Sequence, residues 1–216
     1  MLRSMLIACM LAFTAATGHA EPYALRGYKL GITMDEFKAM PHPEAANYPG
    51  EKIYILCSGD SGATADLAVS GTNAQLGFIY CKHFLKKSTS IGVSYQEVRL
   101  TFNTIGLSPK FVFTPAPDNS SSRLAYIFID SDMRNWEKLY AAFRGEYGNP
   151  ADVASEKIKT GGVIYDKLIA AWKNADSFLF LEQRTDDQLN LMTMDFTHKA
   201  LGDFTIQRRK ALTGKN

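Results

Sequence analysis

The sequence is poor in the features that would point to a particular chemistry. Only three of its 216 residues are cysteine and four are histidine. It contains no C-x-x-C pair, no helical zinc-protease motif and no phosphate-binding glycine loop. Its formal charge of +2 is close to balanced, which excludes the strongly basic character of most nucleic-acid-binding proteins. We therefore expect no cofactor, no metal site and no nucleic-acid partner.

The first twenty residues have the form of a secretory signal. Arg3 precedes an apolar run from Met5 to Ala16, and small residues close the segment at Ala20. We predict that residues 1–20 are a signal peptide cleaved after Ala20, which would place the mature protein in the periplasm or outside the cell. No later segment approaches the ~20 apolar residues needed to cross a bilayer, so we expect no membrane span after cleavage.

Two cysteines, Cys57 and Cys81, remain once Cys9 is removed with the leader. In an oxidising compartment, two cysteines without a competitor are expected to bond to each other. Neither has the neighbouring ligands that a metal site would require. We therefore predict a disulfide between Cys57 and Cys81.

Periodic segments indicate a mixed fold. Thr33 and Glu36 have the spacing of a capping box, which predicts a short helix that ends before Pro41. Apolar residues at helical spacing between Met133 and Tyr147 predict a second helix. Strand patterns occur at 53–57, 76–82, 95–102, 123–129, 163–172, 177–184 and 189–197.

This order of elements predicts an α+β fold. Several strands follow one another without intervening helices, which favours antiparallel pairing over an alternating parallel sheet. We expect a predominantly antiparallel sheet with two main helices packed on it, in a single domain over residues 21–205. The order is also compatible with two similar helix-plus-sheet halves, 21–115 and 123–200.

The C-terminal residues differ from the rest in composition. Three consecutive basic residues occupy Arg208 to Lys210, close to the end of the chain. A charge run in this position is typical of a solvated terminus. We predict a basic tail at 206–216, outside the domain.

Two short segments carry a resemblance to known proteins. Lys29–Thr33 followed by Glu36, and Phe143 followed by Glu146–Pro150, resemble small exported bacterial proteins in which similar segments start and end a helix. Their halves are similar to the helix-plus-antiparallel-sheet unit of the β-lactamase-inhibitor-protein fold and of the small outer-membrane assembly lipoproteins. The resemblance implies an exported, non-catalytic module that binds a protein or another component of the cell envelope. It identifies neither that partner nor the oligomeric state.

A second resemblance implies a different function. Gly59–Ser61 follows a predicted strand, and Asp195 and His198 lie near the C-terminus, as in the first and last blocks of the exported Gly-Asp-Ser esterases. This resemblance implies an ester hydrolase with Ser61 as the nucleophile, His198 as the general base and Asp195 as the acid that orients it. Gly71–Asn73 follows Ser61 too closely to leave room for that family's central blocks. We therefore favour the binding module and keep the hydrolase as the alternative.

Overall fold

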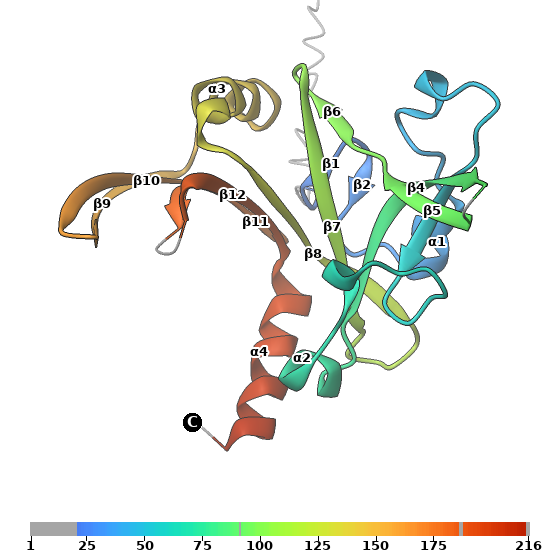
Figure 1. Ribbon diagram of the computed structural model, residues 1–216. Coiled ribbons are helices and arrows are strands. Elements are labelled where there is room, and N and C mark those ends of the chain that lie inside the picture. The colour runs from blue at the N-terminus through green and yellow to red at the C-terminus, as the bar shows by residue number, and fades with distance from the viewer. Residues whose placement is uncertain (1–20, 91, 186–187, 215–216) are drawn as a thin grey trace, which may run out of the picture.

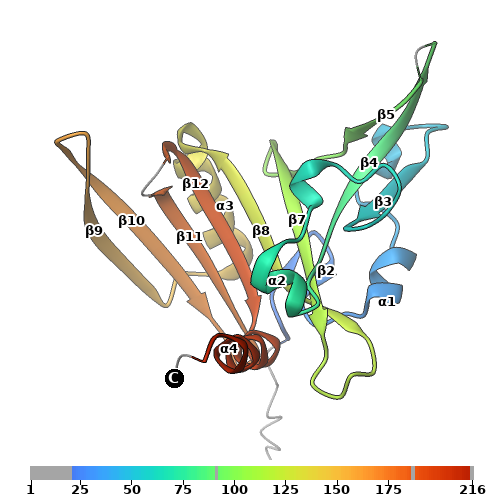
Figure 2. The same ribbon diagram turned by 60° about the horizontal axis from the view of Figure 1, so that its bottom comes forward.

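The main sheet consists of two antiparallel meanders that meet at their last strands (Figures 1 and 2). The computed structural model describes residues 21–90, 92–185 and 188–214. The first meander contains β3 (Ile53–Cys57), β4 (Ile79–Thr89), β7 (Ile105–Pro115) and β8 (Ser122–Asp132). The second contains β9 (Asp152–Thr160), β10 (Val163–Lys173), β11 (Ser177–Thr185) and β12 (Gln188–His198). The strand order is β3-β4-β7-β8-β12-β11-β10-β9, and each pairing is antiparallel.

Shorter elements border this sheet. The short strands are β1 (Ala24–Leu25), β2 (Tyr28–Lys29), β5 (Gly92–Glu97) and β6 (Leu100–Phe102). The helices are α1 (Met34–Ala39), α2 (Gly71–Gln75), α3 (Trp136–Tyr147) and α4 (Lys199–Thr213), with 3₁₀ turns at Ala45–Asn47, Ala65–Leu67 and Met133–Asn135. Only α3 and α4 are long, with 12 and 15 residues. No helix in the described part of the chain is both long and apolar enough to cross a membrane.

The two predicted helices are present, and their start and packing follow the sequence pattern. Thr33 and Glu36 form the full capping box at the start of α1, in which the Glu36 N–H donates to Thr33 Oγ1 at 3.2 Å. α3 buries Trp136, Leu139 and Phe143 on one side. These apolar residues at helical spacing therefore belong to the core.

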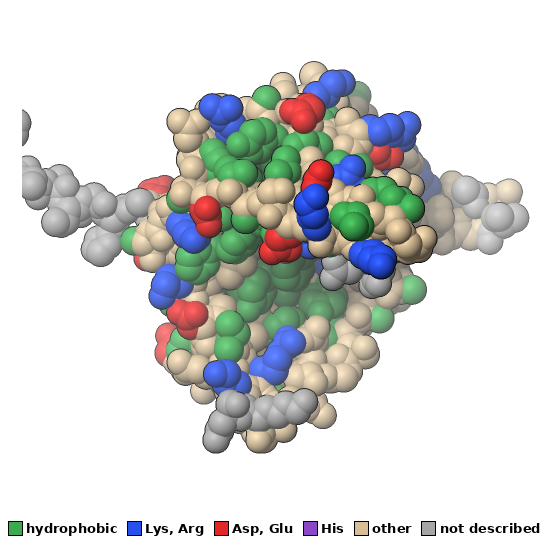
Figure 3. All heavy atoms as spheres, turned by 90° about the vertical axis from the view of Figure 1, so that its left-hand side faces the viewer, with side chains coloured by type: hydrophobic (Ala, Val, Ile, Leu, Met, Phe, Trp, Pro, Cys, Tyr) green, Lys and Arg blue, Asp and Glu red, His purple; other side chains and the backbone are tan. Residues whose placement is uncertain are grey.

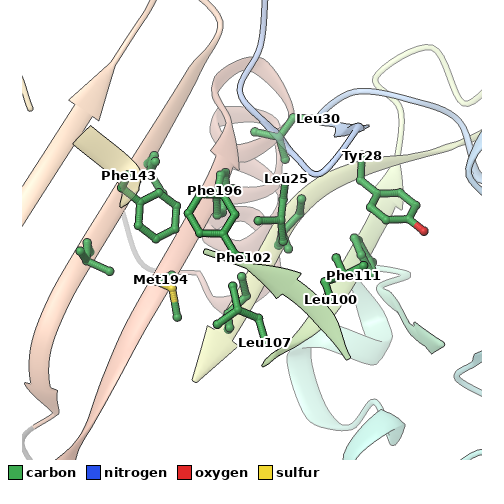
Figure 4. Close-up of a cluster of buried hydrophobic side chains, with 14 of the residues drawn as sticks. Leu25, Tyr28, Leu30, Leu100, Phe102, Leu107, Phe111, Phe143, Met194 and Phe196 are labelled. Atoms are coloured by element: carbon green, nitrogen blue, oxygen red, sulfur yellow. The ribbon is translucent and has the colours of Figure 1, made fainter. Parts of the chain in front are cut away.

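The core lies on the face of the sheet that carries α1 and α3, which we call the inner face. Figure 4 shows Phe143 of α3 beside Phe196 of β12, with side chains from the first meander nearby. The Phe143 and Phe196 rings have centroids 6.0 Å apart. Phe111 of β7 packs against Phe37 of α1 with centroids 4.8 Å apart. A single apolar layer therefore holds both meanders to their helices.

The C-terminal segment corrects the sequence prediction. Residues 206–213 belong to α4, whereas the basic run predicted a solvated tail at 206–216. Arg208 donates to the backbone carbonyl of Leu76 at 2.9 Å, and Arg209 donates to the Asn73 side chain at 2.8 Å. The prediction of a solvated tail is wrong because the guanidinium groups of this charge run bind the α2 region and so attach α4 to it.

The strand predictions are correct in type and incomplete in extent. Among the described residues, 47% lie in strands and 25% in helices, so the α+β prediction with a mainly antiparallel sheet holds in its coarse form. Two of the four helices are long, but the second long helix is α4, which was not predicted, whereas the predicted α1 has only six residues. β7 and β9 were not predicted. The segment 95–102 forms two short strands, β5 and β6, rather than one. β8 lies in the possible second half at 123–200 and pairs with β7 as well as with β12.

The predicted disulfide is confirmed. Cys57 and Cys81 lie directly opposite each other on β3 and β4, with Cα atoms 4.1 Å apart. The bond closes a loop with a sequence separation of 24 residues and attaches the edge strand β3 to the sheet.

Reduction should destabilise the mature protein by about 3 kcal/mol, because the bond restricts the unfolded chain over that loop. Urea unfolding with and without dithiothreitol measures the difference. The double variant Cys57→Ser/Cys81→Ser should match the reduced protein and be insensitive to dithiothreitol. Equal unfolding midpoints for oxidised and reduced protein would contradict a stabilising role.

Candidate binding surface

The opposite face of the sheet, the outer face, carries a cluster of aromatic side chains around β12. Because alternate residues of a strand point to the same face, the neighbouring strands β8 and β11 each place two rings there. The four rings are Tyr126 and Phe128 on β8 and Phe178 and Phe180 on β11. Asp195 of β12 pairs with Phe128 on one side and Phe180 on the other. Thr197 pairs with the remaining two rings, and we call these six residues the aromatic box.

The aromatic box is open to solvent. Phe128 is 36% exposed, and the other three rings are half-buried. The Tyr126 and Phe128 rings stack with centroids 5.5 Å apart, and the Phe178 and Phe180 centroids are 6.2 Å apart. Figure 3 shows hydrophobic side chains in and around a hollow on the side of the molecule that faces left in Figure 1. Large apolar side chains gathered at a surface are typical of an interaction site.

A pocket of about 310 Å³ extends this surface toward α4. Tyr126 and Phe128 line both the pocket and the box, so the two form one continuous surface. Phe78 and Tyr80 add further aromatic walls, and Ile206 of α4, which is 53% exposed, lines the pocket from the other side.

Asp195 is the one carboxylic acid of the aromatic box. Burial, followed by the negative charges of Glu182 and Asp130, raises the pKa of its carboxyl to about 6. In residues 21–90, 92–185 and 188–214, no group donates a hydrogen bond to this carboxylate and no cation forms an ion pair with it. At neutral pH the box therefore holds an ionised, half-buried carboxylate without a partner, which is an unfavourable arrangement for the folded chain.

The two lysines nearest to the aromatic box contact other groups and not Asp195. Glu182 forms an ion pair with Lys167 of β10. Lys110 of β7 lies opposite Phe128 of β8, and its ammonium is 5.5 Å from the centre of the Tyr80 ring. The surroundings of Asp195 are consequently acidic and aromatic, and both properties favour a cation: the carboxylate by charge, the ring faces by cation–π attraction.

The structure does not bring Ser61 and His198 together. Ser61 lies exposed in the turn after β3, where the neighbouring Gly62 lies against the Tyr95 ring. His198 ends β12, and its ring lies against Gly31. Three strands separate β3 from β12, which at ~4.8 Å per strand places the two strands about 19 Å apart.

Asp195 and His198 are separated as well. They are three positions apart on β12 and so point to opposite faces of the sheet. His198 is the N-cap of α4, where its Nδ1 accepts a hydrogen bond from the Leu201 N–H at 3.4 Å. The geometry thus does not assemble the nucleophile, base and orienting acid of the alternative hydrolase.

A pair of buried histidines, His42 and His83, lies under α1. The His42 and His83 rings have centroids 4.6 Å apart. His42 Nδ1 accepts from the Glu44 N–H at 3.1 Å, and Tyr28 Oη lies 3.3 Å from His83 Nε2. Burial, followed by the charge of His42, lowers the pKa of His83 to about 3, so this ring is neutral at physiological pH. Among the described residues, no group of three or more His, Cys, Asp or Glu side chains could hold a metal ion.

The sequence contained part of the signal for the aromatic box. Aromatic residues two positions apart, as in Phe178 and Phe180, predict rings on one face of a strand. For Asp195, the sequence offers only its proximity to His198. What the sequence could not supply is the strand order, because β8 and β11 flank β12 only after the two meanders have paired.

Replacement of Asp195 by Asn should stabilise the free protein at neutral pH by about 2 kcal/mol. The folded-state pKa lies above the ordinary value of 3.8. The ionised form is therefore disfavoured by folding, and wild-type stability falls as pH rises from about 4 to about 6. Urea unfolding of both proteins at pH 4 and pH 7.5 measures this.

The advantage of the Asp195→Asn variant should be present at pH 7.5 and absent at pH 4. Asp152→Asn, a change at an exposed carboxylate of β9, is the matched control and should alter stability by less than about 0.5 kcal/mol. A destabilised Asp195→Asn variant at pH 7.5 would show that the carboxylate has a stabilising partner.

Comparison of the chain with models of protein families, with curated proteins and with solved structures found no match. The resemblance to the β-lactamase-inhibitor-protein fold and the assembly lipoproteins stays a prediction from the sequence. Function therefore has to be argued from the surface itself.

Proposed function

We propose that this protein is an exported binding module whose aromatic box receives a lysine or arginine side chain of another cell-envelope protein. The observation that carries the proposal is the unpartnered Asp195 carboxylate between Phe128 and Phe180. A cation at this position would neutralise the carboxylate and contact the ring faces. The box would then lose the unfavourable charge that it holds in the free protein.

The charges around the box favour a positively charged group of the partner. Asp130 and Glu182 lie one row along the sheet from Asp195 and add negative potential. An anionic group would be repelled by Asp195 and Asp130, since among the described residues only Glu182 is paired with a cation, Lys167, and a neutral group would leave Asp195 unpaired. A basic side chain is the common protein group that satisfies both the carboxylate and the rings.

The extent of the surface favours a polypeptide over a small cation. The box continues into the pocket beside α4, where Phe78, Tyr80 and Ile206 provide apolar walls. A protein segment with a basic residue flanked by apolar residues can occupy both parts at once. Interfaces commonly combine one charged anchor with aromatic surroundings in this way.

The location is part of the proposal. The Cys57–Cys81 disulfide supports folding in an oxidising compartment. The predicted leader at 1–20 supports export, and it lies outside the described residues. An envelope partner follows from this location.

Binding of a basic side chain should depend on Asp195 and on pH. The probes are two peptides, Ac-Leu-Lys-Leu-NH₂ and Ac-Leu-Gln-Leu-NH₂, titrated into ¹⁵N-labelled mature protein at pH 7.5. The lysine peptide should bind about tenfold more tightly and shift the amide signals of Phe128, Phe180 and Asp195. Its affinity should fall below pH 6, because the protonated carboxyl no longer attracts a cation.

Variants separate the carboxylate from the rings. Asp195→Asn should remove the preference for the lysine peptide, and Phe180→Ala should weaken both peptides. Asp152→Asn should bind as the wild type does. Equal affinity of the two peptides for the wild type, or a lysine preference that survives Asp195→Asn, would overturn the proposal.

A further inference from the structure

A second surface, independent of the aromatic box, lies at the free edge of β3. Among the described strands, β3 ends the strand order, with β4 as its one partner. Directly after it, the Ser58 N–H donates to the Tyr80 carbonyl at 2.9 Å. Residues that bond to the partner strand alternate with residues that do not. The even-numbered residues of β3 therefore bond to β4, and the backbone groups of the odd-numbered residues face outward.

Two of the outward-facing residues have free backbone groups. The third, Cys57, is already satisfied: its N–H donates to Asp60 Oδ2 at 2.8 Å, and its carbonyl accepts from the Asp60 N–H at 3.0 Å. Within the described residues, no hydrogen bond to the outward N–H or C=O of Ile53 or Ile55 is formed. This edge can pair with a further strand.

The other edge of the sheet is protected, and this edge is not. β9 carries charged side chains along its exposed length, including Glu156, Lys157 and Lys159. Charges on an edge strand are a common protection against unwanted pairing. β3 reads Ile-Tyr-Ile-Leu-Cys and contains no charged residue.

A pocket of about 460 Å³ lies beside the free edge, on the inner face. Ile53 and Ile55 form its wall on β3, and Met40 and Pro41 form the wall after α1. In an added strand, the residues opposite Ile53 and Ile55 point their side chains to the same face as these two. Those side chains would enter the pocket between these two walls, which are apolar and favour apolar groups.

The rim of this pocket is basic. Lys38 and Lys52 are exposed there, and neither forms an ion pair with another described residue. The acidic rim residue, Glu51, is already paired with Lys87. The Lys52 ammonium lies 5.1 Å from the centre of the Tyr54 ring, and this contact leaves its positive charge without a carboxylate beside it. Two positive charges without an acidic partner among the described residues, next to unprotected backbone groups, favour an acidic partner.

We propose that the free edge of β3 binds an extended segment of another protein, with two apolar side chains that enter the pocket and acidic residues at its ends. The segment adds one antiparallel strand to the sheet through the backbone groups of Ile53 and Ile55. This is strand addition, in which backbone hydrogen bonds give affinity and alternate side chains give specificity. It does not depend on the aromatic box, which lies on the other face around β12.

The test uses three peptide probes and ¹⁵N-labelled mature protein. Ac-Glu-Val-Leu-Val-Glu-NH₂ should slow hydrogen exchange at the amides of Ile53 and Ile55. The same peptide N-methylated at both valines keeps the side chains and loses two backbone donors, so it should bind at least about tenfold more weakly. Ac-Lys-Val-Leu-Val-Lys-NH₂ should also bind at least about tenfold more weakly, because it meets Lys38 and Lys52.

Two sets of variants address the backbone and the charges separately. Ile55→Pro removes one outward N–H, and proline is tolerated at such edge positions, so binding should be lost while the fold persists. Ile55→Val, which keeps the N–H, is the matched control. Lys38→Gln/Lys52→Gln should abolish the preference for the acidic peptide, and it remains informative if Ile55→Pro does not fold.

Several results would overturn the proposal. Equal binding of the N-methylated peptide would show that the edge backbone is not used. Protection of the Ile53 and Ile55 amides without peptide, together with dimerisation in sedimentation experiments, would assign the edge to a second copy of the chain. If the acidic peptide does not bind, the proposed strand addition is also excluded. Asp195→Asn should leave this binding unchanged, so failure here and failure of the aromatic box are distinguishable.

Discussion

The antiparallel pairing of β8 with β12 is the constraint on which the rest of the structure depends. It joins the two meanders and fixes which residues share each face. In its register Phe128 lies opposite Asp195, while Ile127 lies opposite Phe196 and Ile129 opposite Met194. A shift by one residue would turn Asp195 toward α3 and Phe196 toward solvent. The buried inner row thus determines the composition of the aromatic box.

The two faces have different energetic roles. The inner face buries Phe196, Met194 and Ile127 completely beneath α3 and its neighbours, and burial of such side chains contributes about 1.5–3 kcal/mol each. The outer face contains an ionised carboxylate that opposes folding. Groups that reduce stability yet sit on an open surface are common at functional sites. The core therefore supplies the stability that allows Asp195 to stay available for a partner.

The local elements were largely predictable, and the long-range arrangement was not. Thr33 and Glu36 specify their capping box within four residues, and Trp136, Leu139 and Phe143 repeat at helical spacing. The sequence alone therefore predicts α1 and α3. The disulfide followed from composition, since Cys57 and Cys81 had no competitor. β9 was missed because an edge strand exposed along most of its length has no apolar alternation to detect. The basic run at Arg208 and Arg209 misled because its contacts are to residues more than 130 positions away.

The candidate surfaces show the same limit. In the sequence Asp195 is notable only for its place near His198, and its surroundings depend on strands whose order the sequence does not specify. The edge of β3 was predicted as a strand, but its exposure at the end of the sheet was not, because edge position is a property of the whole topology. In both cases the sequence indicates the residue types, and strand pairing determines what they can bind.

The most direct test of this account is the register of β8 and β12 in solution. Cross-strand nuclear Overhauser contacts in the mature protein should connect Ile127 with Phe196, Phe128 with Asp195, and Ile129 with Met194. Contacts offset by one residue, or pairing of β12 with a strand other than β8 and β11, would remove Asp195 from between the aromatic rings and contradict the account.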